Sequence, residues 1–231
     1  MDTLYSSLRN DRMITIFVGS DLEPIHIQQS LLCNTADYFK TLLTNDHFQE
    51  ALSGVARFPE DDVESWKLLA YWAMHRKLPD VVNIVNFCTA WYLGQKYLMP
   101  DFQDEVMYAI LNEALDSAMS DEAFVELFAV TIPGTKPRQL FAELLVDLVV
   151  HDGLFQWSDF PQVQGEHSYM ASILAAMDDL KSDGFSRSRG DLRTAVCHDG
   201  KPLWMRYMVG AGPKQAVGWY WHHDSEEWSL A

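Results

Sequence analysis

Apolar residues recur along this chain at two spacings, which predict two kinds of element. An unbroken run of β-branched and aromatic residues over Ile14–Val18 is typical of a strand, and Pro24–Ile27 predicts a second strand after a short polar turn. We expect the two to form a hairpin with a loop of about five residues. Gly54–Pro59 predicts a third strand, which its proline ends.

Much of the remaining chain places apolar residues three or four positions apart, as helices do. Ser30 is expected to cap one short helix, and Tyr38 and Phe39 lie in the next. A longer helix is expected to begin at Asp61, because Glu64 follows three residues later as in a capping box. Five residues mark the buried face of the helix after it: Phe87, Ala90, Trp91, Gly94 and Leu98.

Helices also dominate the second half of the sequence. Ser120 is placed to cap a helix over Asp121–Val130, Pro137–His151 predicts another, and a third carries Ile173. Ser182–Asp191 is rich in Ser, Gly and Arg, which is typical of a linker. The aromatic tail beyond it predicts short strands or irregular structure. Few strands and many helices, without β–α–β alternation, indicate an α+β fold.

Six segments of the first half, taken together, resemble a BTB/POZ domain of the kind found in filamentous fungi. They are, in chain order, Ile14–Gly19, Ile27–Cys33, Ala36–Lys40, Phe48–Ala51, Phe58–Pro79 and Tyr97–Phe102. The resemblance implies a short three-stranded sheet with a helical cluster over residues 1–117. We expect a helical extension over 118–183, and a linker with an aromatic-rich tail over 184–231.

The resemblance implies a role in protein–protein interaction. Family members self-associate, and the corresponding positions are Leu4, Leu8 and Met13. Many members have Asp where Met13 stands, and a longer N-terminal helix, so we expect a looser homodimer here. Some members are cullin adaptors, whose contact positions correspond to Asn45, Asp46, His47, Phe48, Phe124, Leu127 and Phe128.

Composition and charge narrow the classes of partner. The chain has 231 residues, of which 48% are hydrophobic and 22% charged, as in an ordinary globular protein. Its formal net charge of −16 disfavours direct binding to nucleic acid. No apolar run reaches the roughly 18 residues of a membrane helix, and Cys33, Cys88 and Cys197 form no motif. We therefore expect an intracellular protein, cytoplasmic or nuclear, without disulfides.

Few residues of the sequence are grouped as a catalytic or metal site requires, and we expect no catalytic site, cofactor or metal. Cys197-His198 and His222-His223 are adjacent pairs, and neighbours on a strand face opposite ways, so each pair offers zinc one ligand at most. Aromatic residues of the tail either pack on the helices or form a patch for a partner. Two alternatives stay open: a nuclear transcription or chromatin scaffold, and a metal-dependent or catalytic function in the C-terminal half.

Overall fold

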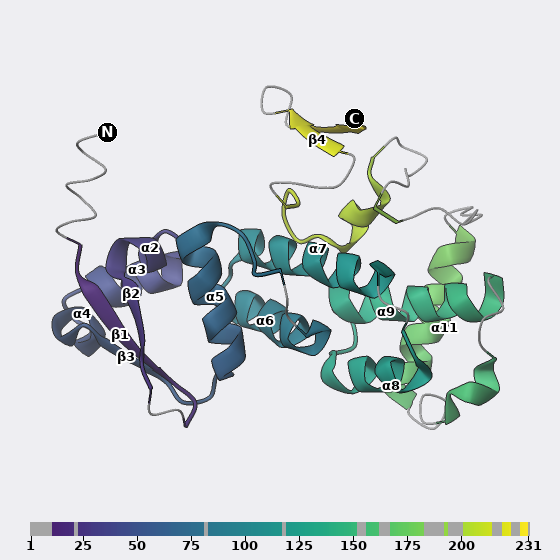
Figure 1. Ribbon diagram of the computed structural model, residues 1–231, viewed down its shortest axis with the longest axis horizontal. Coiled ribbons are helices and arrows are strands. Elements are labelled where there is room, and N and C mark those ends of the chain that lie inside the picture. The colour runs from purple at the N-terminus through teal and green to yellow at the C-terminus, as the bar shows by residue number, and fades with distance from the viewer. Residues whose placement is uncertain are drawn as a thin grey trace. The chain divides into compact units, whose positions relative to one another are not determined.

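The computed structural model describes residues 11–20, 23–80, 83–116, 119–151, 156–161, 167–182, 192–193, 201–213, 219–222 and 227–230 (Figure 1). The chain forms two compact units, Met1–Val106 and Met107–Ala231. The boundary between them lies inside one continuous helix, α7, which spans Pro100–Asp116.

The first unit contains a three-stranded mixed sheet. Its strands are β1 (Met13–Val18), β2 (Ile25–Gln28) and β3 (Val55–Phe58), in the order β2-β1-β3. β1 and β2 form the expected antiparallel hairpin, with Ile14 opposite Ile27. β3 runs parallel to β1, which requires a crossover, and the intervening chain supplies three short helices.

Helices pack beside this sheet and complete the first unit (Figure 1). They are α2 (Gln29–Cys33), α3 (Asp37–Thr44), α4 (Gln49–Ser53), α5 (Val63–His75), α6 (Ile84–Lys96) and the start of α7. Alternate residues of β1 are buried, because a strand directs successive side chains to opposite faces. Aromatic rings fill the core between strands and helices: Phe39, Phe58, Trp66 and Tyr97.

Three local expectations for this unit are wrong. Ser30 does not cap α2: the N-cap residue is Gln28, and Ser30 instead donates to the carboxylate of Asp11. The cap of α5 is Asp62, one residue later than expected, and its carboxylate accepts from the backbone of Ser65. Leu98 lies beyond the end of α6 with φ of 55° and is 82% exposed, because the chain turns there to start α7.

The second unit is mainly helical. Its elements are α8 (Asp121–Val130), α9 (Lys136–Val146), the π-turn η1 (Asp147–His151), η2 (Trp157–Asp159), α11 (His167–Ser182) and η3 (Leu203–Tyr207). The hydroxyl of Ser120 caps α8 by accepting from the backbone of Ala123, as expected. β4 (Trp219–His222) and β5 (Glu227–Leu230) pair antiparallel, so the tail does contain short strands. The α+β prediction is confirmed.

Several residues singled out in the sequence lie outside the described ranges. These are Leu4, Leu8, Cys197, His198, His223 and most of the expected linker. Among the helices that the structure describes, none has both the length and the apolar character needed to cross a bilayer.

Candidate protein interaction surface

The loop between α3 and α4 is a defined turn rather than an open connection. The side-chain oxygen of Asn45 accepts from the backbone of His47 at 3.1 Å. The backbone N–H of Phe48 donates to the carbonyl of Asn45 at 2.9 Å, which closes the turn. All four residues of this loop, including Asp46, are exposed. The four predicted contact positions are therefore brought together on the surface.

Two large apolar side chains of α4 are exposed beside this loop. Phe48 is the N-cap residue of α4 and is 40% exposed, and Leu52 is 67% exposed. Residues four apart on a helix lie on the same face, so the two are neighbours. Phe39 has ring contacts with the buried Phe58, Trp66 and Tyr97 and with its neighbour Tyr38, but not with Phe48. The alternative that Phe48 belongs to the core is therefore disfavoured.

Tyr38 on α3 extends the exposed apolar area. It is 45% exposed, and its ring centroid lies 4.8 Å from that of Tyr97. Partial burial raises the pKa of its hydroxyl; the charge of Lys96 opposes this, and Glu50 on α4 adds to it. We call Tyr38, the loop 45–47, Phe48 and Leu52 the α3–α4 surface.

The buried carboxylate of Asp61 is hydrogen-bonded to residues of the core near Tyr38. The side chain of Asp61 is only 3% exposed and accepts from three donors: Trp66 Nε1 at 2.8 Å, Tyr97 Oη at 2.5 Å and Lys96 Nζ at 2.5 Å. Burial and the hydrogen bond to Asp61 raise the pKa of Tyr97. This network fixes the end of α6 against the loop after β3. Sequence reasoning missed it, because a carboxylate ahead of a helix is typical of a cap.

The predicted contact residues of α8 lie elsewhere, in the core of the second unit. Phe124, Leu127 and Phe128 are all fully buried there. The ring of Phe124 packs 6.1 Å from that of Phe160, and the guanidinium of Arg138 lies 4.9 Å from the ring of Phe128. As folded here, these side chains are not available to a partner, because they form the contact between α8 and its neighbours. The tail residues Trp204 and Tyr207 are buried as well.

Met13, the one self-association position that the structure describes, is half exposed at the start of β1. The preceding Arg12 donates to the carbonyls of Ala51 at 2.5 Å and Leu52 at 2.8 Å, at the end of α4. Gly54, with φ of 72°, passes so close that a β-carbon would lie 2.7 Å from the Arg12 guanidinium. Arg12 therefore ties the start of β1 to the α3–α4 surface.

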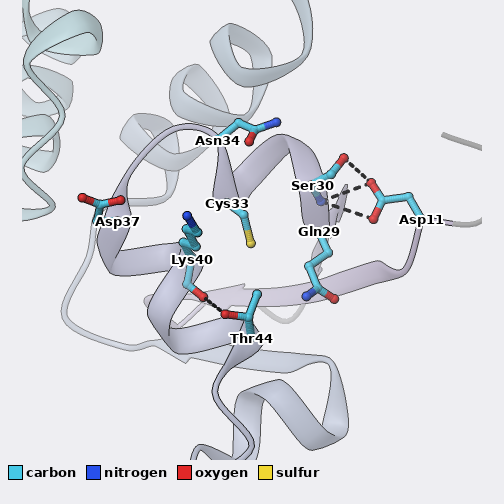
Figure 2. Close-up of a pocket in the computed structure, with 8 residues that line it drawn as sticks. All are labelled: Asp11, Gln29, Ser30, Cys33, Asn34, Asp37, Lys40 and Thr44. Carbon is cyan, nitrogen blue, oxygen red and sulfur yellow. Dashed lines mark hydrogen bonds between the residues drawn. The ribbon is translucent and has the colours of Figure 1, made fainter. Parts of the chain in front are cut away.

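A polar pocket of about 530 Å³ opens between α2 and α3 (Figure 2). Cys33 points into it, Asp37 and Lys40 line it, and Asp11 reaches across to Ser30 at its rim. Burial, followed by the charge of Asp11, raises the pKa of the Cys33 thiol. The thiol is therefore held protonated, unlike that of a nucleophilic cysteine. In the described ranges, no three His, Cys, Asp or Glu side chains gather closely enough to hold a metal ion.

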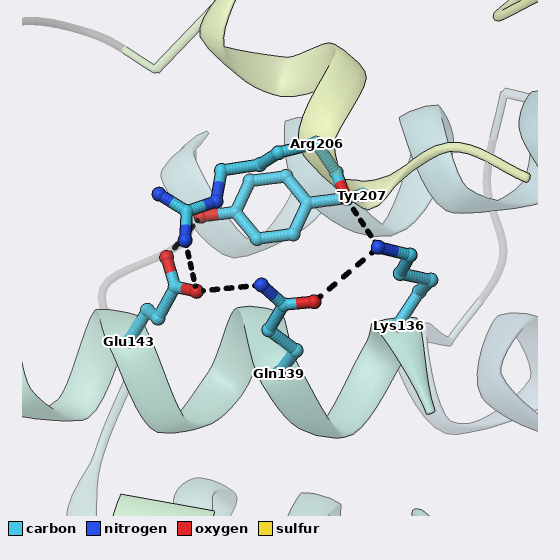
Figure 3. Close-up of polar contacts among 5 residues, drawn as sticks. All are labelled: Lys136, Gln139, Glu143, Arg206 and Tyr207. Carbon is cyan, nitrogen blue, oxygen red and sulfur yellow. Dashed lines mark hydrogen bonds and ion pairs between the residues drawn. The ribbon is translucent and has the colours of Figure 1, made fainter. Parts of the chain in front are cut away.

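A second polar cluster joins η3 to α9 in the second unit (Figure 3). The fully buried carboxylate of Glu143 accepts from Tyr207 Oη at 2.8 Å, Arg206 at 3.0 Å and Gln139 Nε2 at 2.9 Å. Lys136 donates to the carbonyl of Arg206 at 2.6 Å. Because the carboxylate is already bonded to these donors, the cluster resembles a structural ion pair more than a general base.

No protein-family model matches the chain. No curated protein matches it either. The BTB/POZ resemblance therefore stays a prediction, and what the fold defines is a class: an α+β protein with a small mixed sheet and a helical second unit.

Proposed function

We propose that this chain is a non-enzymatic protein-interaction module that binds partners through the α3–α4 surface. One observation carries the proposal: Phe48, the last residue of a hydrogen-bonded turn, is exposed beside the exposed Leu52. Exposing apolar side chains to water is unfavourable, and aromatic residues placed this way are typical anchors of protein interfaces. Tyr38 adds a second aromatic side chain of the type enriched at such interfaces.

Hydrogen bonds fix the backbone of the α3–α4 surface, and this favours the interpretation that its exposed apolar residues bind a partner. The turn at Asn45 fixes Phe48, and Arg12 bonds the last carbonyls of α4. A partner therefore loses little free energy to ordering this backbone when it binds. The acidic Asp46 is exposed in the loop just before the apolar pair, which suits a partner with a basic residue beside an apolar pocket.

The BTB/POZ resemblance supplies a candidate partner, a cullin. The order β2-β1-β3 and the helices around it are compatible with the fold that the resemblance implies. In that case the contact would rest on the loop 45–48, because the apolar residues of α8 are buried. The wider proposal, an interaction module, does not depend on the cullin.

The variant Phe48→Ala tests the surface. Because the ring is partly exposed, we expect the melting temperature to change little, whereas loss of an anchor costs about 2 kcal/mol of binding or roughly thirtyfold in affinity. Met74→Ala is the matched control, since Met74 is exposed to a similar extent on α5. Affinity purification of tagged full-length chain, followed by mass spectrometry, should recover partners with wild type and Met74→Ala that Phe48→Ala loses.

One outcome would count against the proposal, and a second would count only against the cullin-adaptor role. If Phe48→Ala and Leu52→Ala recover the same partners as wild type, the α3–α4 surface is not the contact. If wild type never co-elutes with a purified cullin, the adaptor role is wrong and a transcription or chromatin scaffold becomes the leading interpretation. Stoichiometric zinc in purified protein would instead favour the alternative of a metal-dependent function in the C-terminal half.

A further inference from the structure

Helices α5 and α6 pack side by side in the first unit (Figure 1). A separate groove of about 350 Å³ lies between residues of these two helices and the loop before α6. One wall is a stripe of α5, and the other is the start of α6 with the loop before it. The groove is lined by Glu64, Lys67, Leu68, Tyr71, Pro79, Asn83 and Asn86. None of them belongs to the α3–α4 surface.

The groove combines an apolar strip with free amide groups. Leu68, Tyr71 and Pro79 are buried or half-buried and form the apolar strip. Asn83 caps α6 with its side-chain oxygen, which accepts from Val85 at 2.8 Å and leaves its NH₂ group available. Within the described part of the chain, the side-chain amide of Asn86 has no hydrogen-bond partner. Amide groups both donate and accept, so this wall suits the backbone of an extended peptide.

Basic side chains begin where the groove ends. His75, Arg76 and Lys77 are exposed at the end of α5, and nowhere else in the sequence do three basic residues follow one another. The ring of His75 stacks on that of Tyr71, with centroids 4.2 Å apart and planes at 16°. The basic cluster is therefore continuous with the groove.

The charge balance around the groove differs in sign from that of the chain. From residue 64 to residue 80 there are two lysines and one arginine against Glu64 and Asp80, whereas the whole chain carries −16. Lys67 neutralises Glu64, with 2.7 Å between Nζ and Oε1. An acidic segment is repelled by most of this protein and attracted here.

We propose that the α5–α6 groove binds an extended acidic peptide segment of a partner protein. An apolar side chain of the peptide lies against Tyr71 and Pro79, the amides of Asn83 and Asn86 bond its backbone, and its carboxylates meet His75 and Lys77. This contact differs in place and in charge from the α3–α4 surface, which exposes the acidic Asp46. The two surfaces can therefore serve two partners.

Selection from a displayed library of random peptides tests this. Peptides of about twelve residues span about 40 Å when extended, enough to cover the groove and the basic cluster. Panned against the full-length chain, the library should yield peptides richer in Asp and Glu than the starting pool. A fluorescein-labelled copy of the most enriched peptide should then bind about tenfold more weakly to Lys77→Glu, and binding should weaken as salt rises.

Controls separate this groove from the rest of the surface. Lys40→Glu makes the same charge change on α3 and should bind the peptide as wild type does, and so should Phe48→Ala. Tyr71→Ala should weaken binding without reversing a charge, and circular dichroism checks that each variant is folded. The proposal is overturned if no peptide is enriched, if the enriched peptides lack an acidic excess, or if Lys77→Glu and Tyr71→Ala bind as wild type does. A result with Phe48→Ala bears only on the α3–α4 surface.

Discussion

Asp61 and Asp62 follow one another in the loop after β3, and their carboxylates have different partners. Asp62 is exposed and accepts from the backbone of Ser65 at 2.7 Å, as an N-cap does. Asp61 is buried and accepts from Trp66, Tyr97 and Lys96. Burying a carboxylate is unfavourable unless it is fully hydrogen-bonded, and these three donors compensate for its lost hydration.

Replacing Asp61 by Ala should therefore lower the free energy of unfolding by about 3 kcal/mol, because it leaves two buried donors, on Trp66 and Tyr97, without an acceptor. Asp62→Ala is the matched control and should cost about 1 kcal/mol, the usual value of an N-cap. Urea denaturation followed by tryptophan fluorescence measures both. Equal losses for the two variants would show that the Asp61 network contributes little.

Cys88 on α6 is a residue whose burial has a measurable consequence at high pH. Burial raises the pKa of its thiol from 9.0 to about 12. Above pH 9 the thiol therefore ionises in the unfolded chain and stays protonated in the folded one. This contribution to stability is complete below pH 9 and is lost as the pH rises toward 12, by about 1.4 kcal/mol per pH unit.

The variant Cys88→Ala provides the comparison. Its stability should fall less steeply than that of wild type between pH 9 and pH 11, measured by denaturant unfolding at each pH. In a chain where Cys33 and Cys197 are replaced by Ser, iodoacetamide should label Cys88 only as fast as the protein unfolds. Rapid labelling under native conditions would show that the thiol is accessible.

Among the elements, η3 is joined to α9 by polar contacts that centre on Glu143. It lies about sixty residues beyond α9 in the sequence, and Glu143 holds it there through Arg206 and Tyr207 (Figure 3). Trp204 of η3 packs against Tyr108 of α7, with ring centroids 5.5 Å apart. The C-terminal segment is thereby part of the second unit's core.

Glu143→Ala should release this segment. It removes the carboxylate that accepts from Arg206 and from Tyr207, and breaking a buried ion pair costs about 3–5 kcal/mol. Limited proteolysis should then cut within residues 203–213 at protease concentrations that leave wild type intact there. Gln139→Ala removes a neutral donor to the same carboxylate and a long 3.5 Å contact with Lys136, but leaves the ion pair in place, and should stay resistant. Resistance of both variants would show that apolar packing alone holds η3.

At the scale of the whole molecule, we expect the chain to self-associate as a homodimer. Met13 is half exposed at the first residue of β1, where the resemblance implies a dimer contact. Met13→Lys should weaken a dimer at least tenfold, because burying a methionine contributes about 1.5–3 kcal/mol. Leu98→Lys changes a more exposed apolar residue and is the control. Light scattering across the micromolar range measures both, and a wild-type monomer at high micromolar concentration would contradict the prediction.

The sequence by itself determined most of the elements of this protein. The strands β1, β2 and β3 and the helices α3, α5, α8 and α9 begin within a few residues of their predicted positions. They do so because spacing, proline and polar caps act over one or two turns of chain. The exposed loop 45–48 could also be predicted, since it has the polar residues of a turn between two helical patterns.

Only the tertiary structure decided which of these elements meet and which side chains are left exposed. The parallel pairing of β3 with β1, the burial of Phe124, Leu127 and Phe128, and the exposure of Leu98 all depend on contacts between distant segments. So does the role of Asp61, whose partner Tyr97 lies 36 residues away. The spacing of apolar residues indicates which helix or strand a residue belongs to. Whether that residue is buried depends on the segments that pack against it, and these come from distant parts of the chain.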